Sequence, residues 1–331
     1  MSAPATAASL SERAAAAARW ELAFYGVVIA PGAALFWLST NRPALAPSWA
    51  PWDFSWLEYL AVAFPLAWFC RGLVLSPPEE RLPLWRVITF IAGIAAIYGV
   101  LQTHFDYMAQ HMFFLNRAQH VVMHHLGPFL IALGWVGGTI KRGMPAWAQR
   151  AVESRFVSVA VHVLQQPVLA VVLFVGLFAL WLIPPVHFRA MLDPQLYEVM
   201  NWSMVLDGVL FWCLVLDPRP APPARIGFGI RAALAIFVMF PQIVLGAVIT
   251  FSPRDLYPFY DVCGRLFPSI SALSDQHIGG IVSWIPPAMM SVVALLLVLN
   301  ALRRAEDAAA EASDDQDAAA LAAMASRWTG L

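Results

Sequence analysis

Charged residues are scarce in this chain. Only 12% of its 331 residues are Asp, Glu, Lys or Arg, and 60% are hydrophobic, whereas a soluble domain carries about 25% charged residues. The apolar residues occur in blocks of about 20, the length needed to cross roughly 30 Å of hydrocarbon. The composition therefore excludes an ordinary soluble domain and predicts a polytopic membrane protein. The net charge of −1 gives no indication of nucleic-acid binding.

Cysteine is also scarce, and the common enzyme motifs are absent. The three cysteines, Cys70, Cys213 and Cys263, have no close spacing, so the sequence indicates neither a disulfide framework nor a CxxC redox site. No Gly-rich phosphate loop, HExxH pair or nucleophile elbow occurs. The sequence therefore offers no motif on which a covalent mechanism could be based.

Eight apolar segments are long enough to cross a membrane, so the predicted fold is an all-α transmembrane helical bundle. Several contain proline, which membrane helices tolerate where neighbours satisfy the freed carbonyl. We predict a bundle over 19–303 with an N-terminal tail (1–18) and a polar, Ala-rich C-terminal tail (304–331). The first tail lacks the order of a cleaved signal peptide. The predicted spans are 20–40, 54–75, 84–103, 118–140, 156–183, 199–216, 226–251 and 278–302.

Lysine and arginine are distributed unevenly between the two sides of this bundle. If the N-terminus is cytoplasmic, 15 of the 20 basic residues lie on inner segments and 5 on outer ones. This bias is typical of the positive-inside rule and predicts that both termini are cytoplasmic. An even number of spans agrees with that orientation. The inner loops are too short to hold a catalytic domain, so we do not expect an enzyme.

The histidines gather on the predicted external side. Seven of the eight lie there; His120, His124 and His125 fall in the outer half of the fourth span, shortly after His111. His120 and His124 share a helix face, a spacing at which two imidazoles can hold one metal ion. Imidazole suits copper, zinc and iron, and the thioethers of nearby methionines suit cuprous ion. Copper is our first hypothesis and haem the second; hydrogen bonds between helices are the alternative without a ligand.

A second polar segment, Ser274 to Gly280, begins the eighth span. Asp275 is expected to be the N-cap of that helix. The two glycines of the segment, Gly279 and Gly280, permit close helix approach. Asp275 and His277 are also candidate ligands, or Asp275 is a carboxylate that orients a ligating imidazole. Asp207, inside the sixth span, indicates a polar partner or a proton path within the membrane.

Four segments form a recognisable pattern in chain order. They are Gln119-His120 with Gly127 to Gly134, Gln166-Pro167 with Trp181 to Pro184, Gly208 to Trp212, and Asp275 to Trp284. Together they resemble the CtaG family of membrane proteins linked to the assembly of cytochrome c oxidase, and the similarity covers about residues 85 to 302.

This resemblance implies a multi-spanning inner-membrane protein with outward-facing histidines that serves the maturation of a haem–copper oxidase through copper handling. His120 and the pair Asp275-Gln276 match the family pattern directly. The chain departs from it where Asn116, Leu182 and Asn201 replace family histidines. It therefore resembles a divergent member, in which His124, His125, His111 and His277 are candidates to replace the missing residues.

We expect a multi-pass protein of a bacterial inner membrane that binds copper on its periplasmic face. It would hold or deliver copper while an oxidase is built, with an oxidase subunit or a copper chaperone as partner, and an oligomer is compatible with the sequence. The predicted metal ligands are His120 and His124, with His125, His111, Asp275 and His277 as further candidates.

Three alternative functions stay open. A haem-binding redox protein would use two axial histidines, for example His120 and His277. A copper transporter would need ligands along a path, but the inner half offers only His162, Cys70 and Cys213, which form no continuous track. A metal-free structural partner in oxidase assembly is the third.

Overall fold

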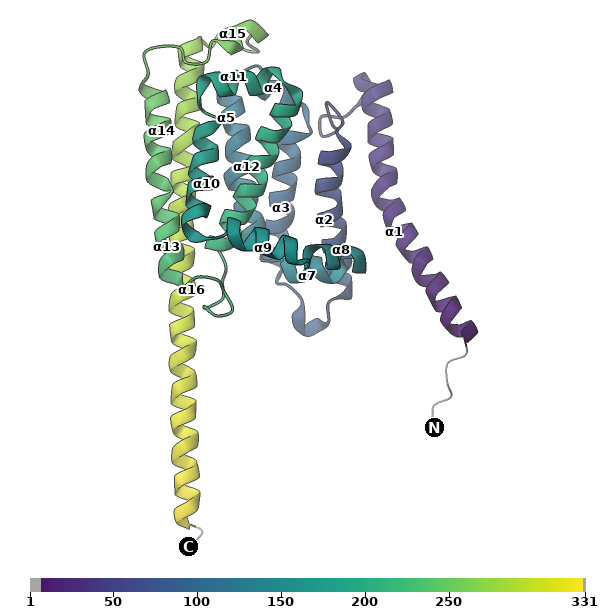
Figure 1. Cartoon of the computed structure of the whole chain (residues 1–331), viewed down its shortest axis with the longest axis vertical. Helices are drawn as coiled ribbons and strands as arrows, with labels where there is room; N and C mark the ends of the chain where they lie inside the picture. The colour runs from purple at the N-terminus through teal and green to yellow at the C-terminus, as the bar shows by residue number, and fades with distance from the viewer. Residues whose placement is uncertain (1–6, 330–331) are drawn as a thin grey trace.

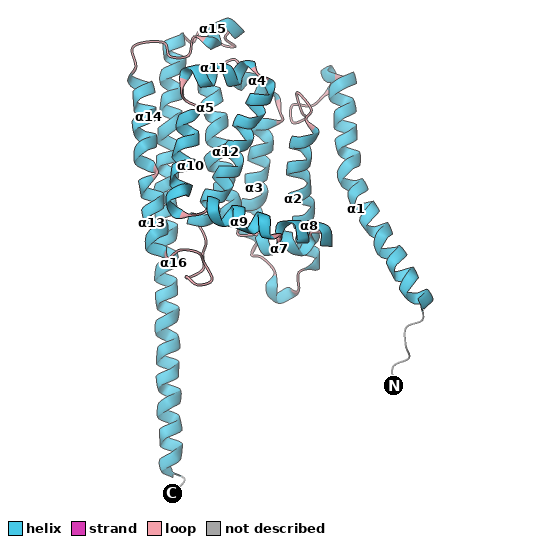
Figure 2. Cartoon of the chain, in the orientation of Figure 1, coloured by secondary structure: helices cyan, strands magenta, loops and turns pink. Residues whose placement is uncertain are grey.

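The computed structural model describes residues 7–329, and every regular element within this range is a helix (Figure 2). Six stretches are long and apolar enough to cross a membrane, and two bent helix pairs raise the number to eight if each pair is one span. The predicted all-α transmembrane bundle is thus confirmed. The six are Glu21–Asn41 of α1 (Ala7–Asn41), α2 (Trp56–Leu75), α3 (Leu84–Leu101), α12 (Pro194–Val215), α13 (Phe228–Phe237) with α14 (Met239–Phe251), and the first part of α16 (Ala272–Thr329).

The fourth predicted span is bent near its end. It consists of α5 (Phe113–Val121), the π-helical turn η3 (Val122–Leu126) and α6 (Gly127–Gly134), which form one stretch. Trp135 follows with a left-handed φ of 48°, and α7 (Gly137–Gly143) leaves at 77° to that stretch. The predicted span 118–140 therefore starts earlier in the structure and breaks at this tryptophan.

The fifth predicted span is bent near its start. α9 (Arg155–Leu164) and α10 (Pro167–Leu180) meet at 75°. The Gln166 side chain accepts the Leu169 N–H and so caps α10. Pro167 occupies the first turn of α10, where no intrahelical bond needs its missing N–H. The predicted span 156–183 is therefore divided by the Gln-Pro pair.

The short helices gather at the two ends of the bundle (Figure 1). One end, which we call the α11 end, carries α4 (His104–Ala109), α11 (Pro184–Leu192) and α15 (Phe259–Cys263). The opposite end, the α7 end, carries α7, α9 and α8 (Ala146–Val152). α1 begins on the side of the α7 end. α16 starts at the α11 end, passes the α7 end and projects far beyond the bundle. The chain thus enters and leaves the bundle on the same side, which agrees with an even number of crossings.

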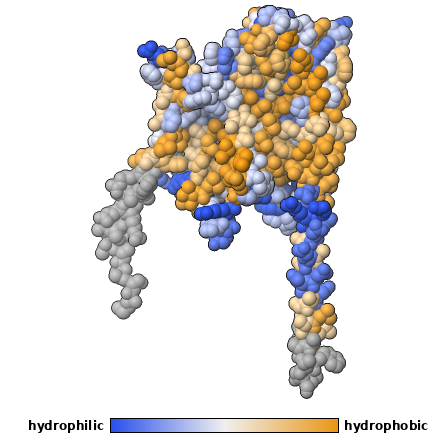
Figure 3. Space-filling view, turned by 180° about the vertical axis from the view of Figure 1, so that it is seen from behind, coloured by the Kyte–Doolittle hydropathy of each residue, from blue (hydrophilic) through white to orange (hydrophobic). Residues whose placement is uncertain are grey.

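Aromatic side chains fill the centre of the bundle, and apolar side chains cover its outside. Phe174 is fully buried, and its ring stacks on Phe211 with 3.9 Å between centroids. Trp212 is equally buried beside them. Large apolar residues are exposed along the spans, and Figure 3 shows a mostly hydrophobic side surface, with hydrophilic residues on the projecting part of α16. Such an extensive exposed apolar surface is typical of contact with lipid.

Candidate functional site

The histidine-rich stretch runs from the end of α5, which holds His120, into the π-helical turn η3, which holds His124 and His125. In η3 the Gly127 N–H bonds to the Val122 carbonyl, five residues earlier. Pro128 follows and has no N–H to offer the carbonyl of His124, four residues before it. The widened turn therefore coincides with a proline that interrupts the α-helical ladder. Single π-turns within α-helices are frequent at functional sites.

Asp207 of α12 is the polar partner of His124. The His124 Nε2 atom lies 3.0 Å from Asp207 Oδ2, and both side chains are buried. A carboxylate at this distance accepts the Nε2–H and leaves Nδ1 with its lone pair, and this Nδ1 has no partner in the described structure. The buried carboxylate anticipated from the sequence thus orients an imidazole, as outer groups do around metal-binding histidines.

Gly208 lets α12 approach this turn closely enough for that contact. A Cβ at position 208 would lie 2.4 Å from the His124 carbonyl oxygen, far inside contact distance. The His124 ring also stacks on Phe174, with 4.1 Å between centroids. The glycine of the Gly208 to Trp212 segment therefore positions His124.

His125 points to a different helix. Its Nε2 accepts the amide N–H of Gln242 on α14 at 3.0 Å, and its Nδ1 has no partner within the described range. The rings of His124 and His125 lie 4.7 Å apart at a steep angle. Both imidazoles are therefore held through Nε2, but in opposite senses: Nδ1 of His124 keeps a lone pair, whereas Nδ1 of His125 carries the proton.

His120 is the least satisfied of the three histidines. It is 1% exposed, and neither ring nitrogen has a hydrogen-bond partner among residues 7–329. Arg117, one turn earlier on α5, is equally buried and keeps Nε and Nη1 without partners, while Nη2 contacts Asn116. Unpaired buried polar groups are costly and rare in folded proteins. The region around His120 therefore has the polar groups of a binding site.

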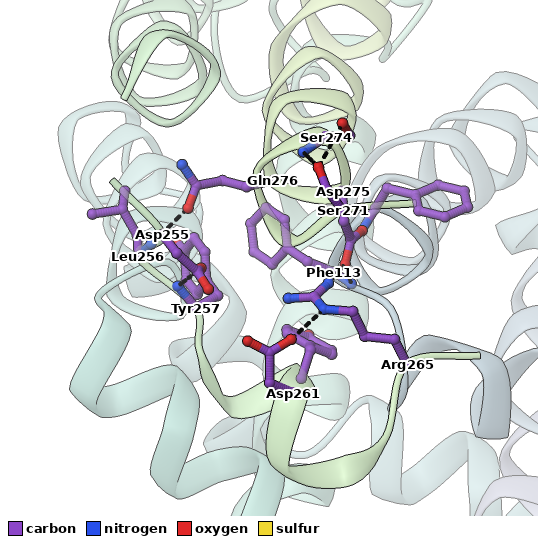
Figure 4. A network of polar contacts seen from close by, with 12 residues as sticks. Phe113, Asp255, Leu256, Tyr257, Asp261, Arg265, Ser271, Ser274, Asp275 and Gln276 are labelled. Carbon is purple, nitrogen blue, oxygen red and sulfur yellow. Dashed lines mark hydrogen bonds and ion pairs between the residues drawn. The ribbon is translucent and has the colours of Figure 1, made fainter. Parts of the chain in front are cut away.

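Asp275 caps a different helix from the one expected (Figure 4). α16 begins at Ala272, so Asp275 lies in its first turn and is not its N-cap. Its carboxylate instead accepts the backbone N–H groups of Phe113, at 3.0 Å, and Phe114, at 2.8 Å, which start α5. Arg265 donates to the same carboxylate at 2.5 Å. The predicted cap is therefore wrong for α16, because the free N–H groups that Asp275 satisfies belong to α5.

Gln276 and His277 hold the loop that precedes α15. Gln276 Oε1 accepts the Leu256 N–H at 2.6 Å, and its Nε2 donates to the Arg254 carbonyl at 3.0 Å (Figure 4). His277 Nε2 lies 3.2 Å from the Ser252 carbonyl. The Asp-Gln-His sequence thus joins α16 to α5 and to the loop after α14.

Only part of the predicted ligand set comes together. His120, His124 and His125 share one turn-and-a-half of buried helix, whereas His111 lies at the α11 end with Nδ1 2.8 Å from the Tyr107 carbonyl. Asp275 is engaged by backbone and by arginine. Across the described part of the chain, no three His, Cys, Asp or Glu side chains are grouped as a ready-made metal site.

A polar network beside the site was not anticipated from the sequence. Gln119 donates to Asp106 Oδ1 at 2.6 Å and to the Val100 carbonyl at 2.8 Å, and the Tyr197 hydroxyl donates to the same Asp106 oxygen at 2.7 Å. Burial raises the pKa of Asp106. The one feature of the sequence that could have indicated this network is Asp106, an acidic residue beside aromatic residues of α4, between two apolar spans. Gln119, which precedes His120, therefore links α5 to α3 and α4.

His187 is a further buried histidine at the α11 end. Its Nε2 lies 2.9 Å from the Tyr260 hydroxyl and its Nδ1 3.2 Å from the Trp181 carbonyl. Burial holds the pKa of His187 well below its usual range. Both ring nitrogens of His187 have hydrogen-bond partners, in contrast to those of His120, and the bond to Tyr260 joins α11 to α15.

The sequence is similar to a known family and to several longer proteins. The sequence matches the family described as cytochrome c oxidase caa3 assembly factor (Caa3_CtaG) over residues 67–305. Uncharacterized proteins of Mycobacterium bovis and Mycobacterium tuberculosis are each 25% identical over 275 residues, which cover 77% of this chain and 40% of theirs. An uncharacterized protein of Mycobacterium leprae is 23% identical over 235 residues, 65% of this chain and 34% of its own.

The chain thus spans about two fifths of the length of these longer relatives. No solved structure matches it. The family match runs from the second half of α2 to residue 305 of α16 and includes all eight histidines. This protein therefore belongs to the cytochrome c oxidase caa3 assembly factor family.

Proposed function

We propose that this protein assists oxidase assembly by holding copper at His120, His124 and His125 and passing it to an oxidase subunit or a copper chaperone. The observation that carries the proposal is the unsatisfied imidazole of His120, buried one turn from His124, whose Nδ1 keeps a lone pair with no hydrogen-bond partner in the described structure. His125 would join through Nδ1 on losing the proton that this nitrogen carries. Membership of an oxidase assembly family supplies the biological setting.

The donor set favours cuprous ion. Imidazole nitrogen and thioether sulfur are suitable ligands for Cu(I). The contacts between Tyr197 and Gln119 and between Asp207 and His124 align α12 with α5. The fully buried Met200 and Met204 lie between these two contacts along α12. Two or three imidazoles with a thioether would make a low-coordinate soft site.

Arg117 supplies a second argument for the monovalent ion. Its guanidinium lies one turn from His120, is buried, and forms no ion pair with a carboxylate among the described residues. Repulsion from this fixed positive charge is half as large for a monovalent ion as for a divalent one at the same distance. We therefore propose that the bound ion is Cu(I).

The decisive measurement is copper content and affinity under reducing conditions. We expect the purified protein to retain copper, and the double variant His120→Asn/His124→Asn to lose it while keeping its thermal unfolding midpoint within a few degrees. The matched control is His111→Ala/His277→Ala, because the hydrogen bonds that the structure describes for these half-buried histidines go to backbone carbonyls. Equal copper in all three proteins contradicts the site, and a strong Soret band in the purified protein favours haem instead.

We further propose that the protein lies in a bacterial inner membrane with the α11 end toward the periplasm, as the distribution of basic residues supports. Cys263 of α15 is exposed at that end. We expect a membrane-impermeant maleimide to label Cys263 in intact spheroplasts. In a Cys263→Ser background, Asp317→Cys on the projecting part of α16 should be labelled only after lysis. The reverse pattern contradicts the orientation.

A further inference from the structure

A basic cavity lies at the α7 end, away from the histidines. It has a volume of about 620 Å³ and is bounded by the end of α6, the start of α7, the end of α12 and the start of α13. Four of its lining residues are charged: Asp217, Arg219, Arg225 and Arg231. The cavity therefore combines a position at one end of the bundle with a net positive lining.

Asp217 and Arg219 neutralise each other. Arg219 Nε donates to Asp217 Oδ1 at 2.9 Å and its Nη2 to Oδ2 at 2.8 Å, a two-pronged pair. The Arg219 guanidinium also lies 5.0 Å from the centre of the Trp135 ring, at the bend that opens one wall of the cavity. This pair shapes the rim and contributes no net charge.

Arg225 and Arg231 leave two positive charges uncompensated. Neither forms an ion pair with a carboxylate in the described part of the chain. Arg231 is fully buried and donates to the backbone carbonyls of Asp217, Arg219 and Ile226, while its Nε has no partner. Arg225 is exposed and makes one bond, to the Val161 carbonyl at 3.3 Å. A buried arginine fixed by carbonyls keeps its whole charge, so the cavity attracts an anion.

The remaining walls decide which anion fits. They are mostly apolar and include Ile131, Val136, Ile140 and Leu214. A hydrated inorganic ion gains nothing from such walls, whereas the glycerol and upper acyl region of a lipid does. Basic pockets between membrane helices at the headgroup level are suited to anionic headgroups. We propose that this cavity binds the phosphate of an anionic phospholipid at the exposed Arg225, with the buried charge of Arg231 adding to the attraction and the glycerol region of the lipid against the apolar walls.

The test compares lipids on the purified full-length protein by native mass spectrometry and thermal unfolding. We expect phosphatidylglycerol to bind about tenfold more tightly than phosphatidylcholine with the same acyl chains, and to raise the unfolding midpoint more. Arg225→Gln should reduce this preference several-fold and Arg225→Lys should retain most of it. Arg231 is left unchanged because its three carbonyl bonds hold the 217–226 loop.

Arg150→Gln is the matched control. Arg150 is an exposed arginine of α8 at the same end that bonds only to the Ala146 carbonyl and does not line the cavity. Its variant should keep the full preference for phosphatidylglycerol. Equal binding of the two lipids, equal loss in the Arg225→Gln and Arg150→Gln variants, or the same stabilisation by millimolar inorganic phosphate would each overturn the proposal.

Discussion

The two ends of the bundle bury basic side chains in opposite ways. Toward the α11 end, His120 has no hydrogen-bond partner among the described residues, and Arg117 leaves two buried nitrogens unbonded there. At the α7 end, Arg231 is as deeply buried but donates to three carbonyls around an open cavity. The first arrangement suits a small ion that needs free lone pairs, and the second suits a large anionic group. Burial of a basic side chain therefore identifies neither site by itself. The two sites differ in how many hydrogen bonds the buried side chains make.

The largest expected effect comes from breaking the contact between α12 and the π-turn. Gly208→Val places a branched side chain against the His124 carbonyl, so we expect destabilisation of about 3 kcal/mol or more and loss of copper binding. Thermal unfolding and copper retention measure it. Gly176→Val is the control, because a Cβ there meets no atom within 4 Å. A stable Gly208→Val protein with normal copper would show that this packing is not needed.

The next effect tests whether Asp275 is structural. Asp275→Asn removes the charge that caps α5 and pairs with Arg265, and should cost about 3 kcal/mol. Asp261→Asn removes the other, exposed partner of the same arginine and should cost less than about 1 kcal/mol. Chemical unfolding in detergent gives both values. If Asp275→Asn instead leaves stability intact and abolishes copper binding, Asp275 is a ligand as the sequence first indicated.

A smaller effect sharpens the role of Asp207. Asp207→Asn removes the carboxylate that orients His124 and should lower copper affinity by about 10- to 100-fold without unfolding the bundle. Competition with a cuprous chelator measures this. Glu58→Gln is the control, a buried carboxylate that bonds to Gln102 in another part of the bundle. Equal copper affinities in the two variants would show that Asp207 does not contribute to metal binding.

The smallest effect concerns pH and His187. Because burial lowers its pKa in the folded protein, the unfolded chain binds more protons between the folded value and the ordinary value near 6.5. Stability is therefore complete above about pH 6.5 and falls as the pH drops below it, by at most about 1.4 kcal/mol per pH unit for this group. His187→Gln should show a shallower loss of stability from pH 6.5 to 5. Identical slopes would indicate that His187 does not contribute.

The fold was largely predictable because apolar run length is a property of the sequence alone. The eight expected segments coincide with six spans and two bent pairs. The bends were not predicted, since a break at Trp135 or at Gln166-Pro167 leaves the apolar run intact. Hydropathy averages over such a residue, whereas the backbone direction depends on its φ and on local caps.

The site was predictable in its residue types and not in its pairings. His120 and His124 followed from spacing and resemblance, but their surroundings come from distant segments. Asp275 meets Phe113 across 162 positions, and Asp207 meets His124 across 83. Such pairs depend on the packing order of the helices, which the sequence pattern of one helix does not contain.

The π-turn has a consequence for the length of the chain. An α-helix advances about 100° per residue, and η3 holds one residue more per hydrogen-bonded ring than an α-turn. Because the π-turn accommodates this extra residue locally, deleting a single residue between Val122 and Leu126 would allow an ordinary α-helix whose two halves keep nearly the same relative orientation. Deleting a residue between His120 and the π-turn would instead rotate His120 by about 100° relative to the Asp207 contact. We therefore expect the π-turn to be the part of this helix that tolerates a one-residue deletion best.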